Sequence, residues 1–430
     1  RLGVFGTWGG NGLNRLRVES VCAAAVFGAT FFASLVFIHF YPPPPPANDA
    51  VEYFRIARNL AAGKGFSFDG VHPYVYRPPL FAFLLGMWFR LAGASVLSAA
   101  VFQCLMHGLS AAAAYLLFRS LRCPTGWAIV LSLGVALQPT LLTATAFVMQ
   151  EPTLLLFTTS ALLATAIWLR GRSAGWACVA GFSWGIVTLG KAVTLFVLPL
   201  VLVYRLACGE EARGSAFRQA ALFSLFFLVT LVPWTARNYL QFHRVIPVND
   251  QVVGVLEWNV SHATPAEGPD GETFVSDLDH RGITGERRME SLRQYVGEGW
   301  RYFFIERVFR NAVSFASPAR DWWWARGRYG PGESRPWYWT LHDYFYRLLF
   351  MALLFRTFQA ARGRLSAGFG FVALFCMTYW AEHALILGIP RFSLPIYPAL
   401  LAMLIPNGGC SANPEGRGEL RSFMSPGRNT

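Results

Sequence analysis

The sequence is poor in charge. Only 14% of its 430 residues are Asp, Glu, Lys or Arg, whereas a soluble domain carries roughly 25%. Hydrophobic residues make up 54%. Such a chain is neither a fully soluble globular protein nor a disordered one. No fixed period runs along it, which excludes the repeat and fibrous classes.

Cysteine motifs and lysines are also scarce. None of the seven cysteines forms a Cys-x-x-Cys pair or a cluster with His, so we expect neither a disulfide framework nor a structural zinc site. Two of the 37 basic residues are lysines, Lys64 and Lys191. The net charge of +13 does not indicate nucleic acid here, because cytoplasmic loops of membrane proteins are rich in Arg and Lys.

Long apolar segments fill much of the chain. A transmembrane helix needs about 20 mostly apolar residues, and backbone groups cannot stay unpaired in lipid, so such segments must be helices. A shorter segment, 79–94, contains Arg90, and we expect it to be re-entrant or interfacial. The sequence predicts an all-α membrane bundle of about 10–12 transmembrane helices. The ten segments that approach a span are 21–41, 96–118, 126–148, 153–169, 174–190, 192–207, 217–236, 343–358, 366–387 and 392–406.

Two polar islands interrupt the apolar segments. The first, 42–77, opens with the run Pro42 to Pro46, which predicts a stiff extended spacer. The second, 237–342, contains a segment, 286–313, with apolar residues at helical spacing among arginines, as in a helix on a membrane surface. We expect an interfacial aromatic belt from Trp322, Trp323, Trp324, Trp337 and Trp339.

The arginines predict the orientation in the membrane. Turns around Arg170, Arg205 and Arg356 read as cytoplasmic, which places both islands on the extracytoplasmic side. The chain ends soon after residue 406, so we expect no soluble C-terminal domain. The expected order is a cytoplasmic N-terminus (1–20), a first transmembrane helix (21–41), a first extracytoplasmic loop (42–77), a transmembrane bundle (78–236), a large extracytoplasmic loop with interfacial helices (237–342), C-terminal transmembrane helices (343–406) and a cytoplasmic tail (407–430).

Four motifs occur in order along residues 49–398. The first motif combines an Asp-Ala-x-x-Tyr sequence, at 49–66, with Tyr-Arg-Pro-Pro-Leu at 76–80. Next come Met-Gln-Glu-Pro-Thr-Leu at 149–154, Pro-Trp-Thr-Ala-Arg-Asn-Tyr at 233–239 and Arg-Phe-Ser-Leu-Pro-Ile-Tyr-Pro at 391–398. Together they resemble the membrane glycosyltransferases of the C fold (GT-C), and most of all the bacterial protein O-mannosyltransferase-like and aminoarabinose-transferase-like (PMT/ArnT-like) family.

The resemblance implies an inverting glycosyltransferase of the bacterial inner membrane. Such an enzyme takes a sugar from a polyprenyl-phosphate carrier and gives it to a hydroxyl or phosphate of a protein, lipid or glycan outside the membrane. Inverting transfer needs a carboxylate that takes the acceptor proton, and a lipid phosphate leaving group needs cations. We expect catalytic roles for Asp49 and Glu151, and donor-phosphate binding by Arg77, Lys191, Arg237 and Arg391. Substrate contacts are expected from Tyr53, Tyr76, Asn238 and His383.

The residues that carry the prediction also have structural readings. Asn48 or Asp49 can cap a helix that runs to about Ala62, with Gly63 ending it. Glu151 suits a helix N-terminus, and Lys191 can reach the membrane interface. Arg237 and Arg391 lie at span ends, where they can anchor headgroups.

Two further alternatives concern metal and function. Glu52 is a capping-box partner for Asp49, or the two carboxylates hold a divalent cation. We assign no other cofactor and no nucleic acid partner. The alternative function is a polytopic lipid or sugar transporter or flippase without transferase activity. Transporters tend to show inverted repeats, and none is evident here.

Overall fold

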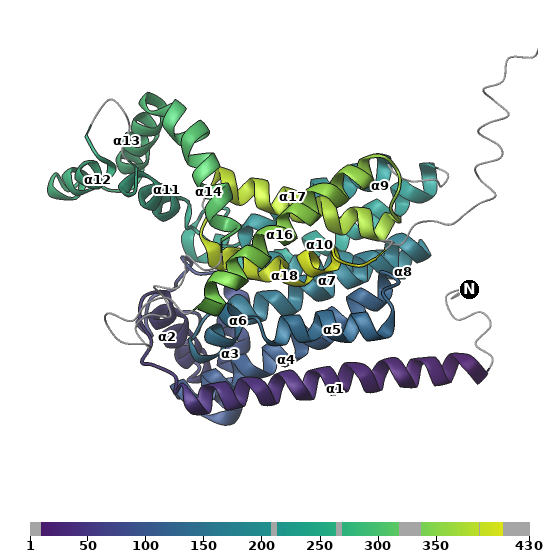
Figure 1. Ribbon diagram of the computed structural model, residues 1–430. Helices are drawn as coiled ribbons and strands as arrows, with labels where there is room; N and C mark the ends of the chain where they lie inside the picture. Colours follow the sequence, from purple (N-terminus) through teal and green to yellow (C-terminus); the bar gives the residue numbers. More distant parts are fainter. Residues whose placement is uncertain (1–9, 208–212, 264–268, 318–336, 387, 407–430) are drawn as a thin grey trace, which may run out of the picture.

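The computed structural model describes residues 10–207, 213–263, 269–317, 337–386 and 388–406. These residues form helices and connecting loops with no strand among them, which confirms the all-α prediction. Many of the long helices run roughly along a common direction (Figure 1).

Each predicted apolar segment falls on one or two helices. By length and composition, α1, α4, α7 and α10 each contain a stretch that could cross a membrane, and the pair α5 and α6 passes the same test together. The chain is a multi-pass membrane protein. The helices are α1 (Gly10–Phe40), α3 (Pro79–Ala92), α4 (Val96–Ser120), α5 (Thr125–Ala136), α6 (Pro139–Ala146), α7 (Glu151–Gly171), α8 (Ala174–Gly190), α9 (Val197–Ala207), α10 (Arg213–Phe242), α16 (Trp337–Ala361), α17 (Ala367–Leu385) and α18 (Tyr397–Ala402).

Several expected spans are shorter or broken. The segment 126–148 is two helices, bent by 49° at the break before Pro139, because a proline removes a backbone donor and ends the preceding helix. The segment 192–207 begins with a 3-10 turn, η1 (Ala192–Phe196), and only its later part, α9, is an α-helix. Helix α3 is a short apolar helix, as expected for 79–94.

The bundle core is apolar and closely packed. Gly185 lets α8 approach α10, since a Cβ at this glycine would lie 2.6 Å from Cβ of Thr230. Small residues allow such close helix contacts in membranes. Cys22, Cys104, Cys123, Cys178 and Cys376 are free thiols, while Cys208 and Cys410 lie outside the described residues.

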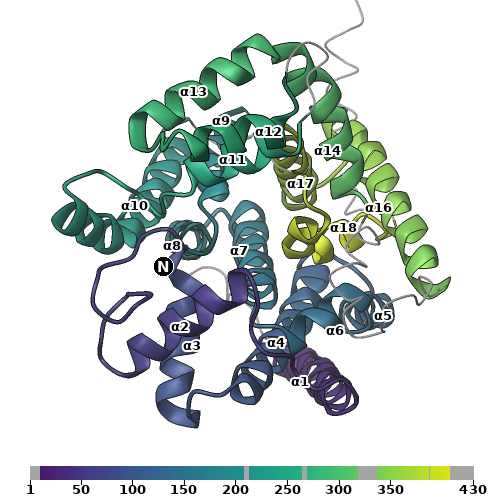
Figure 2. The ribbon, with the colours of Figure 1, turned by 90° about the vertical axis from the view of Figure 1, so that its left-hand side faces the viewer.

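The two polar islands lie at the same end of the bundle. Helix α2 (Asp49–Ala61), from the first island, and α11 (Val252–Ser261), α12 (Gly271–His280) and α13 (Gly285–Glu298), from the second, gather at the left of Figure 1. Figure 2 looks onto that end. This arrangement agrees with the predicted topology; which side of the membrane it faces stays a prediction.

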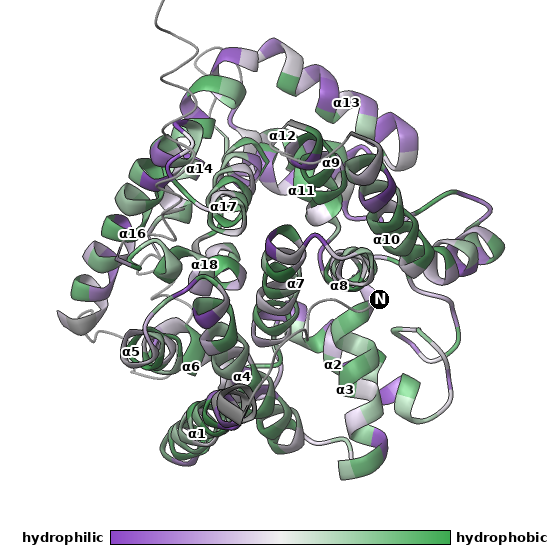
Figure 3. Cartoon of the chain, turned by 90° about the vertical axis from the view of Figure 1, so that its right-hand side faces the viewer, coloured by the Kyte–Doolittle hydropathy of each residue, from purple (hydrophilic) through white to green (hydrophobic). Residues whose placement is uncertain are grey.

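The second island packs on a small core of its own. Val260, Leu278, Leu292 and Tyr295 are buried together, and a π-helical turn, η2 (Tyr302–Glu306), joins α13 to α14 (Arg307–Phe315). Helix α13 carries long hydrophilic stretches, whereas the bundle helices are mainly apolar (Figure 3).

The aromatic-belt prediction is wrong for one of its tryptophans. Trp337 is exposed, but Trp339 is buried, with 1% of its surface accessible. Trp322, Trp323 and Trp324 lie outside the described residues.

Candidate active site

Helix α2 brings Asp49 to the inner edge of the first island. It begins at Asp49, ends near Ala62, and is followed by Gly63 with φ of 76°, as predicted. Asn48 holds the N-cap position with φ of 51° and makes no side-chain cap. Of the two capping candidates, Asn48 therefore holds the N-cap position without a side-chain cap, and the Asp49 carboxylate is bound by arginines instead.

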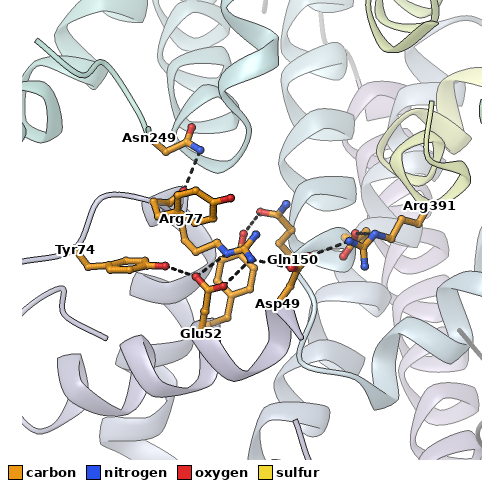
Figure 4. A network of polar contacts seen from close by, with 10 residues as sticks. Asp49, Glu52, Tyr74, Arg77, Gln150, Asn249 and Arg391 are labelled. Carbon is orange, nitrogen blue, oxygen red and sulfur yellow. Dashed lines mark hydrogen bonds and ion pairs between the residues drawn. The ribbon is translucent and has the colours of Figure 1, made fainter. Parts of the chain in front are cut away.

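Two arginines bind the Asp49 carboxylate, one at each of its oxygens. Arg77 Nη2 donates to Asp49 Oδ1 at 2.7 Å, and Arg391 Nη2 donates to Oδ2 at 2.9 Å. Arg77 also donates from Nε and Nη2 to Glu52, at 3.0 and 2.8 Å. Figure 4 shows the resulting network, in which residues 342 positions apart in the chain meet. Because each guanidinium is fixed, the carboxylate has a defined orientation.

The arginines also keep Asp49 ionised. Burial by itself raises the pKa of this carboxyl, but the nearby charges and hydrogen bonds of Arg77 and Arg391 outweigh burial, so the pKa lies below its ordinary value of 3.8. A third of the Asp49 side chain remains exposed. A carboxylate has about four lone-pair positions, so Asp49 can still accept a proton from a bound molecule.

A cavity of about 630 Å³ opens beside this network. Its wall is mainly apolar, with a few charged groups, as is typical of ligand sites. Seven of the ten predicted site residues line it: Asp49, Tyr53, Arg77, Glu151, Lys191, His383 and Arg391.

Glu151 and Tyr53 extend the network along the cavity wall. Glu151 is the first residue of α7 and is 4% exposed, with Oε1 3.7 Å from Arg391 Nε. The Tyr53 hydroxyl donates to Gln150 Oε1 at 2.9 Å. Glu151 therefore occupies the expected helix N-terminus and also lies beside Arg391, which binds Asp49.

Lys191 faces the cavity where α8 ends. Its Nζ lies 3.9 Å from the ring centroid of Phe392 and 5.5 Å from that of Tyr379. No carboxylate of the described chain lies within ion-pair distance of it. Arg77 and Arg391 are both paired with carboxylates, so Lys191 is the better placed of the three to receive an added phosphate.

Arg237, Asn238 and Tyr76 do not line the cavity. Arg237 donates to the backbone oxygens of Tyr74 at 2.9 Å and Phe66 at 3.2 Å. Asn238 is fully buried and donates to the oxygen of Ile246 at 2.9 Å. Residues of the motif at 233–239 therefore hold the loops that follow α2 and α10 in place through hydrogen bonds. The phosphate-binding role expected of Arg237 stays a prediction.

The cavity also has charged residues that the sequence reading did not assign. These are Glu382, next to His383, and the arginines Arg293 and Arg307 of the second island. The sequence carries a signal for Arg293, because Met289, Arg293 and Val296 recur at the spacing of one helical face, whereas Arg307 begins the next helix, α14. All of these residues line the cavity.

The carboxylates of Asp49 and Glu52 do not fit a divalent cation. Arg77 donates to both of them, so a positive group already occupies the space between them. Among the residues that the structure describes, no three His, Cys, Asp or Glu side chains are grouped as metal ligands. We derive no step through a metal.

Several buried polar atoms in the cavity wall lack hydrogen-bond partners in the described part of the chain. They are Glu151 Oε2, Asn259 Oδ1, Arg307 Nε and Glu382 Oε2. An unmade buried hydrogen bond costs about 1–3 kcal/mol, and such groups are rare in native proteins. Their concentration around one cavity indicates a polar ligand.

Comparison with known proteins identifies the fold. Residues 76–236 match the model of the dolichyl-phosphate-mannose-protein mannosyltransferase family. That match contains Arg77, Glu151 and Lys191 and excludes Asp49 and Arg391. No curated protein sequence matches the chain.

Two solved membrane proteins are similar in structure. One is ArnT from Cupriavidus metallidurans bound to undecaprenyl phosphate, with a TM-score of 0.54 and 16% identity over 94% of this chain. The other is the archaeal oligosaccharyltransferase AglB from Archaeoglobus fulgidus, in complex with an inhibitory peptide and a dolichol-phosphate, with a TM-score of 0.54 and 12% identity over 95% of this chain. The match spans 62% of the ArnT chain and 52% of the AglB chain.

These findings confirm the resemblance read from the motifs. Residues 76–236 match the mannosyltransferase family model, and the chain has the GT-C fold of these two proteins.

Proposed function

Because the chain has the GT-C fold, we propose that it is an inverting glycosyltransferase that moves a sugar from a polyprenyl-phosphate carrier to an acceptor hydroxyl or phosphate. The Asp49 carboxylate, held by two arginines at the edge of a cationic cavity, is the observation that carries the proposal. The similarity to a protein solved with undecaprenyl phosphate supports the donor class.

Asp49 acts as the base in the proposed reaction. As the acceptor oxygen attacks the anomeric carbon, its proton passes to Asp49, and the bond between that carbon and the phosphate oxygen breaks. Attack from the face opposite the leaving group inverts the sugar. A base with a lowered pKa is weaker than an unpaired carboxylate, but it is fully ionised at neutral pH, which proton abstraction requires.

One cation, Lys191, binds the leaving phosphate, and two others orient the base. Lys191 contacts the phosphate, and its ammonium stabilises the negative charge that grows as the bond to the sugar breaks. Arg77 and Arg391 orient Asp49, and Glu151 orients Arg391 through their 3.7 Å contact. We place this site on the extracytoplasmic side of the bacterial inner membrane, with the lipid tail entering sideways from the bilayer.

Mass spectrometry of envelope glycans and lipids tests this function. A deletion strain should lose one sugar modification, and the wild-type gene should restore it. Asp49→Asn should fail to restore it although the protein is present in the membrane. An unchanged set of glycans and lipids in the deletion strain would contradict the transferase proposal and favour transport.

A further inference from the structure

Two arginines of the second island face the cavity across from Asp49. Arg293 lies on α13 and Arg307 begins α14, and both line the cavity. In Figure 2, α13 and α14 lie on the opposite side of this end of the bundle from α2. These residues therefore form a second wall, separate from the one built by Asp49, Arg77 and Arg391.

Arg307 is a buried cation without a counter-charge in the described chain. Arg307 is 8% exposed, and its Nε has no hydrogen-bond partner among the described residues. Burial lowers the pKa of Arg307, and the ionisable groups acting on it, Tyr302 and Arg310, include no carboxylate. A buried charge is costly unless it is paired, so this position favours an anion that arrives with a ligand.

The charges on the first wall are largely balanced. Asp49 takes hydrogen bonds from both Arg77 and Arg391, and Glu151 lies 3.7 Å from Arg391. Among the described residues of α13 and α14 that line the cavity, Arg293 and Arg307 are charged and none is a carboxylate; Glu382, which also lines it, lies on α17. An anionic group entering the cavity thus gains an additional attraction at Arg307.

We infer that Arg307, with Arg293 of α13, forms an anion-binding subsite in this second wall, suited to a phosphate or carboxylate. The inference rests on the proposed function for the role of the cavity as a substrate site. The anion belongs either to the departing lipid phosphate or to an acidic group on the acceptor. Both sources share the same recognition chemistry, because a guanidinium binds planar oxyanions through paired hydrogen bonds.

Binding to the purified full chain tests the subsite. The probes are inorganic phosphate and undecaprenyl phosphate, and Lys191→Met serves as the background so that Lys191 does not contribute. Arg307→Met should weaken phosphate binding by about tenfold or more. Arg307→Lys keeps the charge and should retain most of the binding. Arg310→Met is the matched control, because Arg310 is on the same helix and exposed but does not line the cavity.

The second probe identifies the source of the anion. If Arg307→Met also weakens undecaprenyl phosphate binding, the subsite holds the donor phosphate; if it weakens inorganic phosphate binding alone, the subsite serves the acceptor. Equal binding of both probes by Arg307→Met and Arg310→Met overturns the inference. If the wild-type chain binds inorganic phosphate through Arg307 but does not bind undecaprenyl phosphate, the donor proposal fails and the subsite stands.

Discussion

At the scale of single residues, Arg77 organises the carboxylates of the site. It donates to both Asp49 and Glu52, and its charge is one of the causes that lower the pKa of Asp49. Arg77→Gln should therefore raise that pKa and move the acid limb of turnover to higher pH. In the wild-type chain, protonation of Asp49 should limit turnover only at pH values below its ordinary pKa of 3.8. The matched control is Arg58→Gln, an exposed arginine on α2.

The same pairing affects stability in a defined pH window. The folded pKa of Asp49 is lower than its ordinary value of 3.8, so its stabilising contribution is present above that value and is lost as the pH falls through the folded pKa. Arg77→Gln should reduce this dependence when thermal unfolding is followed against pH. If the acid limb of turnover does not move in Arg77→Gln, the titration of Asp49 does not control turnover.

Lys191 provides the second residue-scale prediction. Lys191→Met should weaken binding of undecaprenyl phosphate by about ten- to a hundredfold, since a charge-assisted contact is worth about 1.5–3 kcal/mol. Lys64→Met is the control, because this other lysine is exposed and outside the cavity. Equal affinity of the two variants, measured by equilibrium binding, would give Lys191 an interfacial or structural role instead.

At the scale of elements, the end of α10 holds two loops in place. Arg237 donates to the backbone at Phe66 and Tyr74, and Trp234 Nε1 donates to the oxygen of Val248 at 2.5 Å. Arg237→Met should increase hydrogen exchange in residues 66–74 and should affect donor affinity less than Lys191→Met does. Arg218→Met, an exposed site near the other end of α10, should leave this exchange unchanged. A large loss of donor affinity with normal exchange would instead support phosphate binding by Arg237.

The elements also show what a sequence can and cannot predict. Apolar length was sufficient to place helices at the expected spans, and the proline run followed by Asp49 predicted α2. The motifs pointed to Asp49, Arg77 and Arg391, which do meet. The direction of the Arg237 guanidinium could not be predicted, because it depends on carbonyl groups in a distant loop. Arg307 was missed because helical spacing defines a face but does not say which surface that face meets.

At the scale of the whole molecule, the account depends on the orientation of the bundle. Cysteines introduced at the exposed positions Val71 and Glu272, in a chain whose native cysteines are replaced by Ser, should react with an impermeant thiol reagent added to intact cells. A cysteine at Gly171, at the end of α7, should not react. The reverse labelling pattern would place the cavity on the cytoplasmic side and contradict the proposed topology.

The meeting of distant segments at one cavity is the central claim at this scale. Asp49 comes from the first island. Glu151 begins α7 and Lys191 follows α8, both in the middle part of the chain, and Arg391 comes from its C-terminal part. A transferase needs all of them at one point, with a base beside a bound phosphate. A transporter needs the charges but does not need Asp49 to accept a proton.

Turnover of purified Asp49→Asn tests this claim most directly. The asparagine keeps the shape and one oxygen for an arginine, but it cannot serve as the base. Glu52→Gln is the comparison, because it removes a carboxylate of the same network that does not line the cavity. If Asp49 is the base, Asp49→Asn should fold and bind undecaprenyl phosphate nearly as the wild type does. Its rate of sugar transfer should fall about 100-fold or more. The rate should fall much less in Glu52→Gln. Transfer by Asp49→Asn at close to the wild-type rate would contradict the account.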